Sequence, residues 1–209
     1  IYKENGEVTG LEAELAHLLA EELDCRPVFV EMDFDKLIPA RLEDKIDIII
    51  SGMSITDQRR IRVAFTDPVL RVGQMALVRN EDYRTFDNIG ILVGKPVIAV
   101  EKGTTGALFV ERNCRHATMK TYSSPEKAVQ ALIRKKVDVV MHDAPVIWWM
   151  ASQHEADGIT FQPQPFTNEL IAWGISPQNH QLHEHVNAVL SRWIESGALD
   201  KCIARWLPN

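Results

Sequence analysis

Residues 48–60 read IIISGMSITDQRR, a run of isoleucines that gives way to small hydroxyl residues and then to arginine. A continuous apolar run of this kind is typical of a strand buried on both faces of a parallel sheet. Thr56 suits the N-cap of a following helix, whose first N–H groups have no partner inside the helix. The segment therefore predicts a buried strand, a turn and a helix start, with polar groups at the strand's carboxyl end.

The polar residues of this segment match a carboxylate ligand. Arg59 lies in the expected first helical turn, and its planar guanidinium fork is complementary to a carboxylate. Ser54 adds a hydroxyl group, and Gly52 lets a ligand approach the backbone closely. The same spacing also fits a simple N-cap followed by a surface arginine that pairs with a nearby acid.

Strand and helix patterns alternate along the rest of the chain. Apolar runs predict strands at 26–32, 46–51, 95–100, 117–122 and 137–142. Helical periodicity predicts helices at 10–23, 34–45, 103–113, 123–136, 143–151, 180–196 and 198–207. Ser124 and Asp143 are the expected N-caps of two of these helices, and Gly197 fits the end of another. This alternation predicts an α/β fold with mostly parallel sheets.

Two sets of strand–helix–strand units predict two lobes. No long Gly/Ser linker separates them, so we expect the chain to cross between the lobes twice, within 71–80 and 170–176. The predicted boundaries are 1–68 and 174–209 for lobe 1, 74–168 for lobe 2, and 69–73 and 169–173 for the hinge.

Ligands of open α/β sheets bind beyond the carboxyl ends of the strands. The turn Gly-Thr-Thr-Gly at 103–106 follows one predicted strand, and His142 and Asp143 follow another. Such a Gly-Thr turn commonly does no more than cap a helix, and Asp143 fits a cap as well. Asp143 also fits a partner for a ligand ammonium. A carboxylate site and an ammonium site in one chain together predict an α-amino acid as ligand.

Composition excludes several other classes of function. The formal charge of −6 gives no support for nucleic-acid binding, and no apolar run reaches the roughly 18 residues of a membrane span. Cys25, Cys114 and Cys202 form no C-x-x-C pair, which leaves either one disulfide with a free thiol or three thiols. His180, His183 and His185 open a helix without a complete set of metal ligands. We expect no metal, no cofactor and no catalytic triad.

Five segments in order resemble the bacterial extracellular solute-binding proteins of family 3, the polar amino-acid receptors of uptake transporters. They are GEVTGLEAELAHLLAEEL (6–23), DIIISGMSITDQRRIRVAFTDPVL (47–70), AVEKGTTG (99–106), KKVDVVMHDAPV (135–146) and ARWLPN (204–209). Glutamine-binding and histidine-binding proteins are the nearest types. The resemblance implies a two-lobed periplasmic-binding-protein-like fold of type II, in which a ligand is clamped between the lobes.

The resemblance also assigns roles to individual residues. Arg59 would bind the α-carboxylate, aided by Ser54 and the backbone at Thr105, and Asp143 would bind the α-ammonium with Ser54 and the Gly52 carbonyl. The remaining ligand contacts would come from Phe34, which stacks on the ligand, and from Ser51, His142 and Glu101, which approach its side chain. Glutamine receptors tend to carry lysine where this chain has Glu101, and the acid favours a cationic or neutral polar side chain.

Location and partners follow from the same resemblance. It implies a monomer that lies in the periplasm, or outside the cell on a lipid anchor, after removal of a signal peptide, with the membrane permease of an ABC transporter as partner. Family members open with a β-strand ahead of the first helix, and that first strand is expected to be absent here. We expect a binding protein rather than an enzyme. The alternatives are a cyclohexadienyl-dehydratase-like enzyme on the same fold, and the sensor domain of a membrane receptor or lytic transglycosylase.

Overall fold

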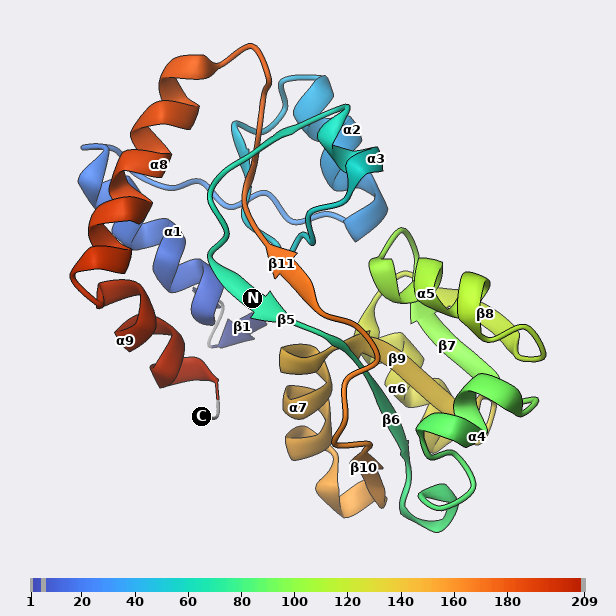
Figure 1. Ribbon diagram of the computed structural model, residues 1–209. Coiled ribbons are helices and arrows are strands. Elements are labelled where there is room, and N and C mark those ends of the chain that lie inside the picture. Colours follow the sequence, from blue (N-terminus) through green and yellow to red (C-terminus); the bar gives the residue numbers. More distant parts are fainter. Residues whose placement is uncertain (1, 5–6, 208–209) are drawn as a thin grey trace. The chain divides into compact units, whose positions relative to one another are not determined.

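A computed structural model describes residues 2–4 and 7–207 of the chain. The chain divides into two compact units (Figure 1). Unit 1 comprises Ile1–Met32, Lys36–Arg71 and Leu170–Asn209, and unit 2 comprises Asp33–Asp35 and Val72–Glu169. The predicted α/β class is confirmed, because strands and helices alternate in both units.

Unit 2 is built on a five-stranded sheet with the strand order β10-β6-β9-β7-β8. The strands are β6 (Gln74–Arg79), β7 (Val97–Glu101), β8 (Thr118–Tyr122), β9 (Val139–Asp143) and β10 (Ile159–Phe161). β7 pairs in parallel with β8 and with β9, whereas β6 runs antiparallel to both β9 and β10. The carboxyl ends of β7 and β9 therefore meet at one edge of the sheet.

Apolar side chains alternate between the two faces of this sheet, and both faces are covered by helices. Met75 and Leu77 of β6 pack in one core cluster, which also holds residues of α6 (Pro125–Ile133) and α7 (Ala144–Gln153). Ala76 and Val78 pack in the opposite cluster, to which α4 (Asn88–Val93) and α5 (Thr105–Asn113) contribute. Two short 3-10 helices complete the unit, η2 (Asn80–Asp82) and η3 (Glu155–Asp157).

Side-chain caps fix where two helices of unit 2 begin. Ser124 Oγ accepts a hydrogen bond from Lys127 N at 3.4 Å, and Pro125 occupies the first turn of α6, as the sequence predicts. Thr104 Oγ1 accepts from Ala107 N at 3.3 Å and donates to Glu101 O at 2.8 Å. The two hydrogen bonds of Thr104 therefore connect the start of α5 to the end of β7.

Unit 1 holds a three-stranded antiparallel sheet and several helices. β12 (Gly174–Ile175) lies between β3 (Ile48–Ile49) and β4 (Ala64–Phe65). α1 (Leu11–Glu22) packs with α8 (His180–Glu195) and α9 (Ala198–Trp206). Trp173 is fully buried, and its ring meets that of Trp193 edge-on at 6.5 Å between centroids. Gly197 links α8 to α9 in a left-handed conformation, φ +71°, which places it one residue beyond the C-cap of α8.

The remaining elements are short. β1 (Tyr2–Glu4) pairs antiparallel with β2 (Glu7–Thr9), and β5 (Leu70–Val72) pairs with β11 (Glu169–Ile171). The predicted helix at 34–45 is a 3-10 turn, η1 (Phe34–Lys36), that leads into α2 (Leu37–Leu42), and α3 (Asp57–Arg60) is a single turn.

The prediction of a strand at 26–32 is wrong. Among the residues that the structure describes, no strand pairs with this segment, and Val28 is 86% exposed. An alternating apolar pattern stabilises a strand only where a neighbouring strand accepts its hydrogen bonds. The predicted strand at 46–51 is shortened for a related reason, because only Ile48 and Ile49 are paired with β12.

All three cysteines are thiols, which settles the alternatives left open by the sequence. Cys25 is exposed, while burial raises the pKa of the Cys114 and Cys202 thiols. Within residues 2–4 and 7–207, every helix is too short or too polar to cross a membrane.

Candidate functional site

Four predicted site residues, Ser51, Gly52, Ser54 and Arg59, form what we call the unit 1 cluster. Thr56 Oγ1 accepts a hydrogen bond from Arg59 N at 3.2 Å, so the predicted N-cap of α3 is confirmed. The Arg59 side chain folds back, and its Nη1 donates to Ser54 O at 2.7 Å. Arg59 is only 8% exposed, which places a permanent positive charge in a largely desolvated position.

The backbone that follows β3 makes this turn possible. Gly52 has φ +59°, in the left-handed region, and no atom lies within 4 Å of the position that a Cβ would occupy. Its N–H donates to the Glu12 carboxylate of α1. Ser51 is half-buried, while Ser54 is 1% exposed and pairs with Ile171 in an isolated β-bridge. The open side of the Gly52 turn leaves room for a group to approach the backbone.

Five residues form what we call the unit 2 cluster: Gln74, Glu101, Thr105, His142 and Asp143. Gln74 opens β6 and faces Asp143 of β9 in the strand register. Its Nε2 donates to Thr105 Oγ1 at 3.1 Å and to Asp143 Oδ1. Sequence reasoning did not identify Gln74. The available signal was a polar residue opening the strand QMALVR ahead of the apolar run MALV.

Asp143 occupies the N-cap position of α7, as predicted, but its side chain makes no capping hydrogen bond. One of the two N–H groups that could bond to a capping side chain is missing, because Pro145 in the first turn of α7 has no N–H. The interpretation of Asp143 as a capping side chain is therefore wrong. Its carboxylate bonds to Gln74 instead and belongs to the unit 2 cluster.

His142 and Glu101 form a buried pair at the adjacent ends of β9 and β7. His142 Nε2 lies 2.9 Å from Glu101 Oε2. Burial lowers the pKa of His142, but the hydrogen bond to Glu101 and the charges of Asp143 and Glu101 outweigh it, so the pKa is raised. A neutral ring with its proton on Nε2 satisfies both contacts, because Nδ1 then accepts from Asp143 N. A second proton on the ring would displace that backbone hydrogen bond.

Phe34 is half-buried and opens η1, on the short segment that is grouped with unit 2. The next residue, Asp35, pairs with Lys102 Nζ at 2.9 Å and raises the pKa of that ammonium group. A Cβ placed on Gly103 would lie 3.1 Å from Asp35 Cβ. Phe34 therefore lies on a segment that packs against the Gly-Thr turn before α5.

The structure brings the predicted residues into two groups of different chemistry. The unit 1 cluster presents a guanidinium, a hydroxyl and an open backbone turn. The unit 2 cluster presents carboxylates, an imidazole and a hydroxyl within a network of hydrogen bonds. A cation suits a ligand carboxylate, and the acidic group suits a ligand ammonium.

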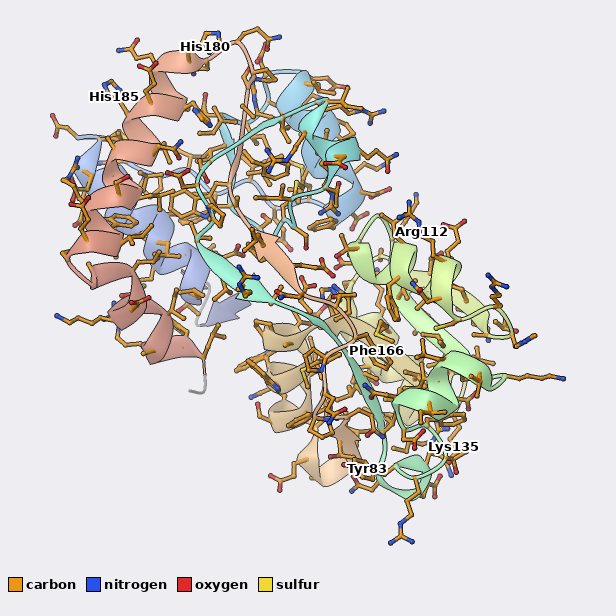
Figure 2. The ribbon with its side chains drawn as sticks, viewed as in Figure 1. Tyr83, Arg112, Lys135, Phe166, His180 and His185 are labelled. Atoms are coloured by element: carbon orange, nitrogen blue, oxygen red, sulfur yellow. The ribbon has the colours of Figure 1, made fainter. Side chains whose placement is uncertain are left out.

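The histidines of α8 do not converge on a metal ion. His183 Nε2 lies 2.8 Å from Phe65 O, and His180 and His185 are exposed and point outward (Figure 2). In the part of the chain that the structure describes, no three His, Cys, Asp or Glu side chains form a group that could hold a metal ion.

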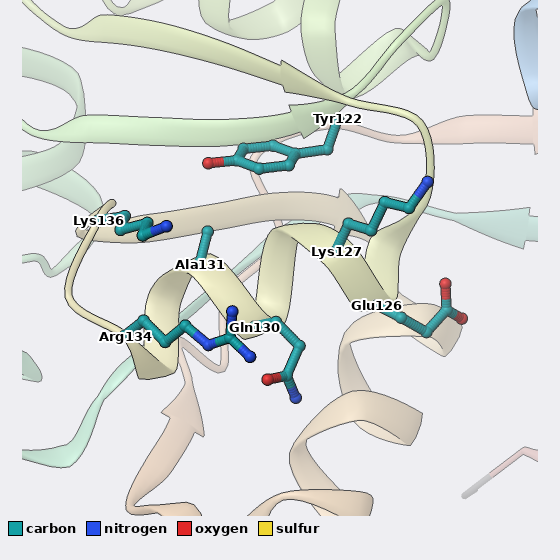
Figure 3. A pocket seen from close by; sticks show the side chains of 7 residues that line it. All are labelled: Tyr122, Glu126, Lys127, Gln130, Ala131, Arg134 and Lys136. Atoms are coloured by element: carbon teal, nitrogen blue, oxygen red, sulfur yellow. The ribbon is translucent and has the colours of Figure 1, made fainter.

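A shallow hollow of about 450 Å³ lies elsewhere on unit 2. Figure 3 shows the cationic ends of Lys127, Arg134 and Lys136 spread around it rather than aimed at one point. All three are exposed, and none of the predicted site residues lines the hollow. Its lining residues are Tyr122, Glu126, Lys127, Gln130, Ala131, Arg134 and Lys136. We therefore place the candidate site in the two clusters and not here.

Comparisons with known proteins agree on one family. The sequence profile of the bacterial extracellular solute-binding proteins, family 3, matches residues 1–209. The chain is 30% identical over 211 residues to the ABC transporter arginine-binding protein 1 of Escherichia coli (strain K12), covering 98% of this chain and 84% of that protein.

Two solved structures are similar at 28% identity. An ancestral arginine-binding protein bound to arginine gives a TM-score of 0.92, covering 99% of this chain and 91% of the other. An ancestral amino acid-binding protein described as a precursor of cyclohexadienyl dehydratase gives a TM-score of 0.91, covering 99% and 88%.

Proposed function

The chain belongs to the bacterial extracellular solute-binding proteins of family 3, and from that premise we propose that it binds a free polar or basic L-α-amino acid and delivers it to an uptake transporter of the ABC type. The observation that carries the proposal is the opposite chemistry of the two clusters. Unit 1 holds a buried arginine, and unit 2 holds a half-buried carboxylate, Asp143, beside a hydroxyl group. An α-amino acid carries the two complementary charges.

We assign the α-carboxylate to Arg59 and the α-ammonium to Asp143. A guanidinium binds a carboxylate through two parallel N–H groups, and its position next to Ser54 is fixed by the 2.7 Å bond to that residue's carbonyl oxygen. The Ser54 side chain and the backbone at Gly52 and Thr105 complete the polar contacts. Because Arg59 is largely shielded from water and Asp143 is half-buried, each contributes more than a fully exposed charge would.

The side chain of the ligand is assigned to Phe34, Ser51, Glu101 and His142. The Glu101 carboxylate accepts hydrogen bonds and attracts a positive charge, which favours a cationic or neutral polar side chain over an acidic one. The similarity to two arginine-binding proteins supports a basic ligand.

The partner we propose is the membrane permease of an ABC transporter, with the protein acting as a monomer in the periplasm. The segments 69–73 and 169–173 are proposed as the hinge. They contain the points at which the chain passes from Arg71 to Val72 and from Glu169 to Leu170 between units.

A thermal-shift screen across the common L-amino acids tests this function. A ligand that binds only the folded protein raises its melting temperature by mass action. We expect the largest shift with arginine, lysine, histidine or glutamine, followed by saturable heat release in a calorimetric titration. No shift with any amino acid, for a protein that melts cooperatively, would contradict the proposal.

A dehydratase on the same fold is the competing function, and it is favoured by the structural neighbour described as a precursor of such an enzyme. That neighbour is itself described as an amino acid-binding protein. Incubation with prephenate or arogenate, followed by ultraviolet absorbance, separates the two functions. We expect no aromatic product from either compound, because the site is assigned to binding a free amino acid; an ammonium partner such as Asp143 would be unnecessary for prephenate, which has no amino group.

A further inference from the structure

We propose that Gln74 is a positioning residue of the amino-acid site, whose buried side-chain amide holds the Asp143 carboxylate and the Thr105 hydroxyl in the orientation that the ligand requires. This inference rests on the function proposed above and adds a residue to it. Gln74 itself is 1% exposed, so it acts through its two neighbours rather than by presenting its own surface to the ligand.

The fold places Gln74 between two elements that would otherwise be independent. It faces Asp143 across the antiparallel pair β6–β9, while Thr105 is the first residue of α5. Both backbone polar groups of Gln74 form hydrogen bonds: its N–H donates to Thr167 Oγ1 at 2.9 Å, and its carbonyl oxygen accepts from Phe166 N at 2.8 Å. The side chain therefore extends from a fixed point.

The amide has one orientation that satisfies this arrangement. Nε2 has two hydrogens, and it donates one to Thr105 Oγ1 and one to Asp143 Oδ1. Reversing the amide would set Oε1 against the carboxylate oxygen, so that two acceptors would face each other. Both donors of Gln74 are thus committed to the two groups that we assign to the ligand site.

The acceptor side of the amide faces Gly106. Gln74 Oε1 is buried, and among the described residues it has no hydrogen-bond partner. A Cβ on Gly106 would lie 2.6 Å from this oxygen and 3.3 Å from Met141 O, so the glycine provides the space that the amide occupies. An unsatisfied buried acceptor destabilises a fold, and an apolar side chain of the same length would avoid the penalty. At position 74 the amide therefore directs both of its donors to Thr105 and Asp143 and leaves its own oxygen unpaired among the described residues.

The contact also leaves the Thr105 hydroxyl able to donate its hydrogen to a ligand. Thr105 Oγ1 accepts a hydrogen bond from Gln74 Nε2. The hydroxyl hydrogen of Thr105 is not used in that bond and can be donated to an acceptor. Asp143 remains an acceptor. Gln74 thus sets a donor and an acceptor side by side in unit 2, as an amino acid with both a carboxylate and an ammonium group requires.

The first test replaces Gln74 with methionine, which keeps the length of the side chain and removes the amide. Gln162→Met is the matched control, because Gln162 is also buried in unit 2 and its Nε2 bridges two acceptors, Tyr83 O and Phe86 O, outside the unit 2 cluster. Calorimetry with the amino acid that gives the largest thermal shift should show affinity about tenfold or more weaker in Gln74→Met. Gln162→Met should bind as the wild type does.

The second test is Gln74→Glu, which has a readout that a purely structural role would not change. Two facing carboxylates favour sharing one proton, and the shared proton restores a donor toward Asp143. The loss of affinity relative to wild type should therefore grow about tenfold or more between about pH 5 and about pH 8. His142, whose pKa is raised, also lies near this position, and the wild-type protein measured at the same pH values corrects for its titration.

The outcomes separate this inference from the proposed function. If the wild-type protein binds no amino acid, the function fails and the role of Gln74 fails with it. If the wild type binds and Gln74→Met binds equally tightly, or if the ratio for Gln74→Glu is independent of pH, only the inference about Gln74 is overturned. Should Gln74→Met not fold, the pH dependence of Gln74→Glu decides alone.

Discussion

Truncation of Arg59 to alanine removes the buried cation of the unit 1 cluster. Two effects follow from the structure. The fold loses the 2.7 Å hydrogen bond from Nη1 to Ser54 O, a bond from a charged donor whose loss costs about 1.5–3 kcal/mol of unfolding free energy. The ligand loses the partner of its carboxylate, which costs about 2–5 kcal/mol of binding free energy. The dissociation constant should therefore rise by about 30-fold or more.

Arg41→Ala separates these two effects. Arg41 is 7% exposed, lies in unit 1, and donates from Nη1 to Ile46 O at 2.6 Å and from Nη2 to Asp44 at 2.8 Å. It matches Arg59 in burial and in its bond to a backbone carbonyl, but it is not assigned to the ligand. We expect both variants to be destabilised to a similar extent in urea, and only Arg59→Ala to lose affinity in calorimetry below its melting transition. Equal affinity in wild type and Arg59→Ala would refute the reasoning.

Three further perturbations test separate parts of the account. Gly106→Ala should weaken amino-acid binding measured by calorimetry while changing the melting temperature little. The reason is that the new Cβ displaces the end of the flexible Gln74 side chain. An affinity equal to that of the wild type would count against the role assigned to Gln74. Glu14→Gln should lower unfolding free energy near neutral pH by less than about 1 kcal/mol, because the hydrogen bond from Arg205 lowers the pKa of a solvent-screened Glu14. The difference in unfolding free energy between wild type and Glu14→Gln, measured in urea, should be present above the ordinary carboxyl pKa. It should disappear as the pH falls through the lowered pKa of Glu14 in the folded protein. A difference that does not change with pH would contradict this prediction. Arg79→Met should destabilise the protein by about 3–5 kcal/mol in the same assay, because Arg79 binds Leu132 O, Val137 O and two acids, and a cost below about 1 kcal/mol would show that these contacts are not needed.

The local part of the site was predictable from the sequence. Thr56 caps α3 through a hydrogen bond within its own turn, and Ser124 caps α6 in the same way. Such contacts join residues three positions apart, so their spacing carries the information. The family followed from five segments in order, because a fold shared over the whole chain leaves its pattern in many short stretches.

The contacts that depend on distant strands were not predictable. The segment 26–32 has the pattern of a strand, yet its state depends on a partner that the pattern does not specify. Gln74 meets Asp143 only because β6 and β9 pair in one particular register, 69 positions apart in the sequence. The sequence also indicated that Asp143 caps α7, because it shows where the helix begins. It does not show that the Gln74 amide binds the Asp143 carboxylate.

Calorimetric titration with three related ligands tests the central claim most directly. They are the amino acid that binds best, its decarboxylated amine and its deaminated acid. Because Arg59 is assigned to one pole of the zwitterion and Asp143 to the other, each incomplete ligand should bind at least about 30-fold more weakly than the amino acid. An amine or an acid that binds as tightly as the full amino acid would contradict the assignment of the corresponding residue, and equal binding of all three would contradict the account as a whole.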